Sequence, residues 1–181
     1  MKIYMHKNNI GRIRFHCSIL GKRQSIVFDT GAPNTMITLK LAKDLGLKAI
    51  SSKQYSVNIG GAVVKSVVAV LPEITIGSIT IKDVRVLAGL NTPDWRDTIL
   101  LGLNVANYFK YTVDRSVDGG FIDLDLSDRQ APTGSQRGKF NHLILSKLEN
   151  GVRKSVFDVT PDPLISSEIS IDDICRSNAD I

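Results

Sequence analysis

Asp29, Thr30 and Gly31 form the segment of this 181-residue sequence with the clearest chemical potential. The Asp follows the apolar, strand-forming residues Ile26, Val27 and Phe28, and the small residue Ala32 comes after the Gly. A carboxylate that a strand delivers into a turn can exchange protons with water, which is the task of a general acid or base. Asp, Thr and Gly are also common in ordinary turns, so other features of the sequence must decide between a plain turn and a catalytic site.

Two further features follow this segment along the chain. A hairpin pattern with strands at residues 55–59 and 62–70 has Gly60-Gly61 at its tip, where glycine adopts a positive φ without strain. About 70 residues after the Asp comes Ile99-Leu100-Leu101-Gly102. A short helix pattern then begins near Asn104, a suitable helix cap.

In this order the features resemble the retropepsin-like aspartic proteases, the single-lobe family of retroviral proteases and their cellular and prokaryotic relatives. The resemblance covers about residues 10–127, as far as a closing strand after Asp114. It implies an all-β fold: a single-lobe, retropepsin-like β-barrel with a flap hairpin and one or two short helices. It implies that Asp29, Thr30 and Gly31 are catalytic. The residues that it implies in substrate binding are Ala32, Ile59, Gly60, Gly61, Ala62, Val63 and Leu100.

Two positions depart from the family pattern. Pro33-Asn34 replaces the commoner Ser or Asn followed by a hydrophobic residue, which changes the edge of the expected pocket. Leu103 stands where retroviral members carry an Arg that ties the two protomers together. The resemblance therefore points to a non-viral branch with a different dimer contact. Leu100 and Leu101 are expected to cover the back of the Asp loop and to line a pocket.

Hydrolysis of a peptide bond without a metal or a covalent nucleophile needs one group that takes a proton from water and another that gives one to the carbonyl oxygen. Two carboxylates about 3 Å apart do both, because they cannot both be ionised. The sequence holds one Asp-Thr-Gly and is too short for two lobes, so the second carboxylate must come from Asp29 of a second copy.

We therefore predict a homodimeric aspartic endopeptidase that cleaves extended peptides beside hydrophobic residues. It requires no cofactor and is most active at mildly acidic pH. The alternative is a peptide-binding or dimerisation module that has the same fold and does not catalyse hydrolysis.

The elements that must position the Asp are short strands separated by turns. Residues 13–20 and 24–28 flank a predicted turn at Gly21-Lys22-Arg23, and residues 74–76 and 79–87 flank one at Gly77-Ser78. Residues 121–126 alternate with a period of two and form the last strand of the series. One short helix is predicted to start at the cap Thr38 and to stop at Gly46.

Composition and charge exclude several classes of protein. Hydrophobic residues make up 43% of the chain and charged residues 23%, which is typical of a globular protein. Of the net charge of +5, residues 1–127 carry +6, but the basic residues are dispersed, so no nucleic-acid partner is expected. No apolar run is long enough to span a membrane. We therefore expect a cytoplasmic protein.

The cysteines and histidines predict neither a disulfide framework nor a metal site. Cys17 and Cys175 are far apart in the sequence, and Cys17 is expected to be a buried apolar residue. His6, His16 and His142 lack the spacing of zinc ligands.

The domain organisation follows from a change of composition after residue 127. We predict a retropepsin-like aspartic protease domain at 1–127, a linker at 128–140 and a C-terminal appendage at 141–181. In the appendage, Asn150-Gly151 predicts a hairpin of residues 142–148 and 152–159, which we prefer to a helix over 141–150. The rest is expected to be a loosely ordered tail with a helical turn near 171–175.

Overall fold

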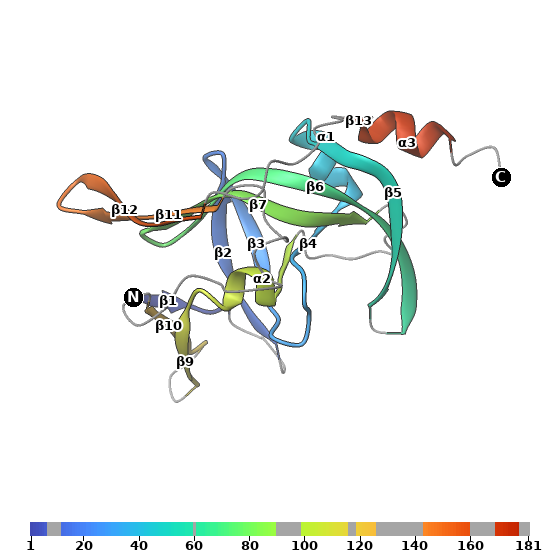
Figure 1. Cartoon of the computed structure of the whole chain (residues 1–181). Coiled ribbons are helices and arrows are strands. Elements are labelled where there is room, and N and C mark those ends of the chain that lie inside the picture. Colours follow the sequence, from blue (N-terminus) through green and yellow to red (C-terminus); the bar gives the residue numbers. More distant parts are fainter. Residues whose placement is uncertain are drawn as a thin grey trace.

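The computed structural model of the chain describes residues 1–6, 12–59, 61–89, 99–115, 119–125, 143–159 and 169–177. Within them, thirteen strands and three short helices form a mostly β fold (Figure 1). The strands are β1 (Lys2–Tyr4), β2 (Ile13–Ile19), β3 (Lys22–Phe28), β4 (Met36–Thr38), β5 (Lys48–Ile59), β6 (Ala62–Ile76), β7 (Ile79–Gly89), β8 (Ile99–Leu101), β9 (Lys110–Asp114), β10 (Phe121–Asp125), β11 (Leu143–Glu149), β12 (Val152–Val159) and β13 (Ile169–Ser170). The helices are α1 (Leu39–Asp44), α2 (Leu103–Ala106) and α3 (Ile171–Ser177).

The centre of the fold is a closed barrel of six strands. The main sheet has the order β12-β11-β7-β4-β8-β3-β2-β6-β5-β13, and β6 also pairs with β7. This extra pairing closes a ring of β7, β4, β8, β3, β2 and β6. The barrel encloses one hydrophobic core, in which Phe15, Phe109 and Leu71 are fully buried. The predicted all-β barrel with short helices is confirmed.

The barrel strands are joined by tight hairpins. The turn between β2 and β3 consists of Leu20 and Gly21, which both have positive φ (47° and 79°). Such a two-residue turn matches the twist of the strands, so Lys22 and Arg23 belong to β3 and the predicted turn at Gly21-Lys22-Arg23 was placed too far along the chain. The strand β6 is continuous from Ala62, after the hairpin tip, to Ile76, before the turn at Gly77. The separate strand expected at 74–76 is therefore the last part of β6.

Local signals account for α1 but not for α2. Thr38 Oγ1 accepts a hydrogen bond from Leu41 N (3.1 Å), and Gly46 ends the helix with a positive φ of 64°. The predicted limits of this helix are therefore confirmed. The cap of α2 is Gly102 and not Asn104 as predicted, because Asn104 lies inside the helix and its side chain is engaged elsewhere.

C-terminal segments extend the main sheet at both of its ends. The predicted hairpin around Asn150-Gly151 is present as β11 and β12, and β11 pairs with β7. At the other end β13 pairs with β5, and the next residues form α3, whose Ile171 and Ile174 are buried in the main core. The residues of α3 are thus packed on the barrel. The expected linker at 128–140 lies outside the described residues.

A second, smaller sheet has the order β1-β10-β9. The strand β10 is the closing strand predicted at 121–126, although residue 126 lies outside the described residues.

Cys17 lies in β2 and is buried, as predicted. None of the helices in the described ranges is long and apolar enough to cross a membrane.

Candidate active site

The segment between β3 and β4, residues 29–35, is the Asp29 loop, and backbone contacts hold it in place. The amide N of Asp29 donates to the carbonyl oxygen of Leu101 in β8 (3.0 Å). The amide N of Gly31 donates to Oδ1 of Asp29 (2.8 Å), which orients the carboxylate. A Cβ at Gly31 would lie 3.2 Å from that same Oδ1. Glycine at this position therefore leaves space beside the carboxylate.

The chain that follows Asp29 crosses the start of α2 at very close range. The amide N of Leu103 donates to the carbonyl oxygen of Ala32 (2.7 Å), and that of Asn104 donates to the carbonyl oxygen of Pro33 (3.2 Å). Backbone atoms of Asn34 occupy the space that a Cβ of Gly102 would need, and the Ala32 oxygen would lie 2.8 Å from it. Only glycine fits at residue 102 without a shift of this backbone.

A network of buried hydrogen bonds around Asn104 stabilises the same crossing. Oδ1 of Asn104 accepts hydrogen bonds from the amide N (2.6 Å) and Oγ1 (2.8 Å) of Thr35. Its Nδ2 donates to the carbonyl oxygen of Arg85 in β7 (2.9 Å), while Gly102 N donates to Thr35 Oγ1 (3.2 Å). Three elements that meet at the site, the Asp29 loop, α2 and β7, are therefore tied together by one amide side chain.

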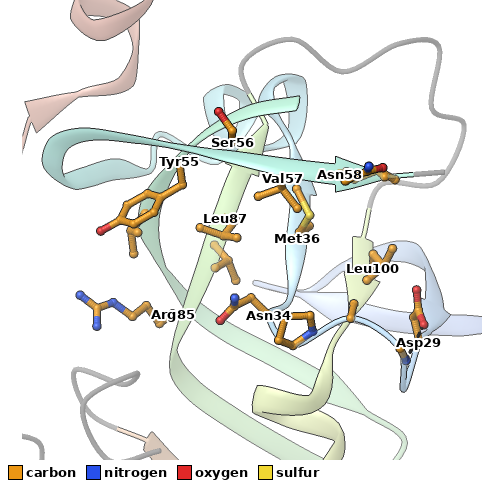
Figure 2. A pocket seen from close by; sticks show the side chains of 16 residues that line it. Asp29, Asn34, Met36, Tyr55, Ser56, Val57, Asn58, Arg85, Leu87 and Leu100 are labelled. Carbon is orange, nitrogen blue, oxygen red and sulfur yellow. Dashed lines mark hydrogen bonds between the residues drawn. The ribbon is translucent and has the colours of Figure 1, made fainter. Parts of the chain in front are cut away.

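The carboxylate of Asp29 lies at one end of a cleft of about 780 Å³ (Figure 2). The floor is an apolar cluster of the buried residues Met36, Val68, Leu87 and Leu100. The β5 segment that leads to the hairpin tip lies above this floor, and it packs Val57 and Ile59 against the cluster. The residues that line the cleft are Asp29, Gly31, Ala32, Pro33, Asn34, Met36, Tyr55, Ser56, Val57, Asn58, Ile59, Val68, Arg85, Val86, Leu87 and Leu100.

Some of the residues that the sequence indicated meet in this cleft and others do not. Asp29, Gly31, Ala32, Ile59 and Leu100 line it.

The remaining predicted residues lie elsewhere. Thr30 is exposed beside Asp29, while Gly61, Ala62 and Val63 form the hairpin tip outside the cleft, with Val63 68% exposed. Leu101 is fully buried in the main core and does not line the cleft. Gly60 lies outside the described residues.

Sequence reasoning missed the end of the cleft that lies opposite Asp29. Figure 2 shows Tyr55 and Arg85 at that end. Partial burial lowers the pKa of the Arg85 guanidinium from its ordinary value, although the nearby Tyr55 opposes this shift. The alternation of β7, in which residues 85 and 87 share a face, was the available signal. This alternation alone does not say which face of β7 lies in the cleft, because that depends on the pairing of Leu87 with Met36 of β4.

The cleft offers carboxylate, amide, phenol and guanidinium groups around an apolar floor. Among the described residues there is no group of three or more His, Cys, Asp or Glu side chains that could hold a metal ion. Asp29 supplies the one carboxylate among the described residues that line the cleft.

Comparison with known proteins finds one matching family and several structures that are similar to the chain. The family model described as aspartyl protease matches residues 15–105. Among solved structures, the chain is similar to a retropepsin-like aspartic protease from Rickettsia conorii, with 22% identity, a TM-score of 0.49 and coverage of 67% of this chain and 90% of that one. None of the curated proteins matches the chain.

Two further structures resemble the chain less closely. The EIAV protease complexed with the inhibitor HBY-793 is 21% identical over 56% of this chain and 91% of that one, with a TM-score of 0.40. The retroviral protease-like domain of Ddi1 from Leishmania major is 14% identical over 71% and 98%, also with a TM-score of 0.40.

Proposed function

We propose that this chain, which belongs to the aspartyl protease family, is an endopeptidase that works as a homodimer. The observation that carries the proposal is the position of Asp29, whose carboxylate lies in a backbone-anchored loop at the end of an apolar cleft. Asp29 is the one acidic side chain among the described residues that line this cleft. In the proposal the second carboxylate is that of Asp29 in a second copy.

In the proposed mechanism the two Asp29 carboxylates share one proton across a two-fold axis. The ionised carboxylate takes a proton from a water molecule, whose oxygen attacks the peptide carbonyl carbon. The protonated carboxyl group gives its proton to the carbonyl oxygen, which forms a tetrahedral intermediate. Collapse of the intermediate breaks the C–N bond: the nitrogen leaves with a proton from one carboxyl group of the pair, and a hydroxyl of the intermediate returns a proton to the other carboxylate. No metal and no covalent enzyme intermediate is needed.

The surroundings of Asp29 support this role. Gly31 N holds one carboxylate oxygen at 2.8 Å, so the acid is oriented before substrate binds. Thr30 is exposed beside Asp29, where its hydroxyl is available to the loop of a second subunit. These features suit a site that is completed by a symmetric partner.

The shape of the cleft favours an extended, partly hydrophobic substrate. The floor of Met36, Val68, Leu87 and Leu100 offers apolar contacts to side chains near the cleaved bond. We propose that the hairpin tip, with Gly60, Gly61, Ala62 and Val63, closes over the bound peptide and donates backbone hydrogen bonds to it.

Cleavage of an unstructured protein by the wild type and by the Asp29→Asn variant tests the proposal. We expect the wild type to cleave best at mildly acidic pH, and we expect the variant to lose at least about a thousandfold in rate, since Asn cannot exchange the required protons. Asp44→Asn, which alters an exposed carboxylate on α1 outside the cleft, is the matched control and should cleave like the wild type. Equal cleavage by the wild type and Asp29→Asn would refute the proposal.

A further inference from the structure

The end of the cleft that lies opposite Asp29 differs in chemistry from the rest. Arg85 is the one basic side chain among the described residues that line the cleft, and it stands beside the phenol of Tyr55 (Figure 2). A guanidinium group carries five N–H donors in a planar fork that fits a carboxylate. The cleft therefore joins an acid–base end and an apolar floor to a cationic end.

The strand register gives the separation of the two ends. Leu87 of β7 pairs with Met36 of β4, Met36 pairs with Leu100 of β8, and Leu100 pairs with Val27 of β3. Three spacings between neighbouring strands amount to roughly 14 Å. Arg85 lies two residues before Leu87 on the same face of β7, and Asp29 lies two residues beyond Val27. At about 3.3 Å per residue, this separation corresponds to about four residues of an extended peptide, and the length of the Arg85 side chain brings the third residue within reach as well.

The position of Arg85 is fixed by the fold. Its carbonyl oxygen accepts a hydrogen bond from Asn104 Nδ2 (2.9 Å), and β7 is paired with both β4 and β6 around it. The guanidinium therefore projects from a rigid strand. Partial burial beside the apolar floor makes an ion pair at this point stronger than one in bulk water.

We propose that Arg85 is a specificity-determining residue that selects substrates with an acidic side chain three or four residues from the cleaved peptide bond. This inference rests on the proposed function, because it assumes that Asp29 marks the point of cleavage. A Glu or Asp at that position forms a charge-assisted hydrogen bond with the guanidinium, while the residues in between lie over the apolar floor.

The proposed dimer symmetry extends the rule to both sides of the cleaved bond. A second subunit related by a two-fold axis carries its own Arg85 at the opposite end of the joint cleft. Peptides with an acidic residue on either side are therefore recognised, and peptides with one on each side are the best substrates.

Matched peptides test the inference. Each has the same hydrophobic residues around one cleavable bond and carries Glu, Gln or Lys at the third or fourth position. All peptides are acetylated and amidated, so that the varied residue supplies the only carboxylate. We expect the wild type to favour Glu over Gln in kcat/KM by about tenfold, which corresponds to about 1.4 kcal/mol, and to cleave the Lys peptide least.

Two cleft variants and one control complete the design. Arg85→Gln should cleave the Glu and Gln peptides equally, and Arg85→Glu should favour the Lys peptide. Lys82→Gln removes the same charge from an exposed position on β7 and should keep the wild-type preference. Unchanged melting temperatures show that the variants are folded. A wild type that ignores the residue at these positions, or a Glu preference that persists in Arg85→Gln, overturns the inference.

Binding separates this inference from the proposed function. Fluorescence anisotropy of labelled Glu and Gln peptides on the Asp29→Asn variant does not depend on catalysis. About tenfold tighter binding of the Glu peptide, lost on adding Arg85→Gln, supports the role of Arg85 even if the wild type cleaves nothing. Equal binding of the two peptides contradicts it even if cleavage is observed.

Discussion

The amide of Asn104 is the most informative residue to perturb, because it joins three elements at the site through one side chain. Replacement by Ala leaves the amide N and hydroxyl of the fully buried Thr35 without the acceptor Asn104 Oδ1, and it removes the hydrogen bond that Asn104 Nδ2 donates to the carbonyl oxygen of Arg85. A buried polar group without a partner costs about 1–3 kcal/mol. Allowing for the half-buried position of Arg85, we expect Asn104→Ala to lower the free energy of unfolding by about 3 kcal/mol.

Guanidinium denaturation measures this loss directly, and a melting curve should show a decrease of about 6–12 °C for a chain of this size. Asn58→Ala is the matched control, because Asn58 is exposed and accepts a single hydrogen bond, from Gly61 N (3.0 Å). The control should change stability by no more than about 0.5 kcal/mol.

A double-mutant cycle tests whether Asn104 acts through Thr35. The Thr35→Val variant keeps the shape of the side chain but removes the hydroxyl that donates to Asn104 and accepts from Gly102. The double variant should be less destabilised than the sum of the two single variants, by about 1 kcal/mol. If Asn104→Ala is as stable as the wild type, or if the two effects simply add, the network does not hold the site as described.

Three further predictions concern other parts of the structure. Gly102→Ala should unfold far more easily than the wild type in denaturant, because backbone atoms already fill the place of its Cβ. Burial raises the pKa of the Cys17 thiol to about 12, so at pH 8 a thiol reagent should modify the half-exposed Cys175 and spare Cys17 until the protein is denatured. Lys43 bonds Asp172 (2.7 Å) and holds the pKa of that carboxyl below its ordinary value of 3.8, so hydrogen exchange should show the amides of α3 losing protection as pH falls below 3.8, whereas above it this contact is at full strength.

Each of these predictions has an outcome that contradicts it. A Gly102→Ala variant with wild-type stability would mean that the crossing of the two loops is looser than described. Modification of Cys17 at the rate of Cys175 in the native protein would place it outside the core. The acid sensitivity of α3 should be smaller in Asp172→Asn, and an identical pH profile in that variant would remove the ion pair as its cause.

The parts of the fold that the sequence predicted depend on local signals. The Thr38 cap and the Gly46 stop lie within one helix and its ends, and the turn at Gly77 requires a positive φ that glycine adopts freely. The Asp29 turn was found for the same reason. It follows an apolar strand and contains a glycine that leaves space beside the carboxylate.

The parts that were missed depend on contacts between distant segments. The strands β4 and β8 have three residues each and are completely buried, so neither shows the alternation of a half-exposed strand. Asn104 was expected to cap α2, but it bonds Thr35, which lies 69 residues earlier in the chain. Arg85 enters the cleft only because β7 lies beside β4 in the closed barrel.

Activity of mixed dimers tests most directly whether two Asp29 side chains form one catalytic site. Wild-type and Asp29→Asn subunits are mixed in varying proportions, allowed to exchange, and assayed at constant total concentration. If each site needs both carboxylates, activity follows the square of the wild-type fraction, and an equal mixture retains about a quarter of the full rate. Activity that instead falls in direct proportion to the wild-type fraction would mean that one subunit hydrolyses peptides alone, which contradicts the shared site.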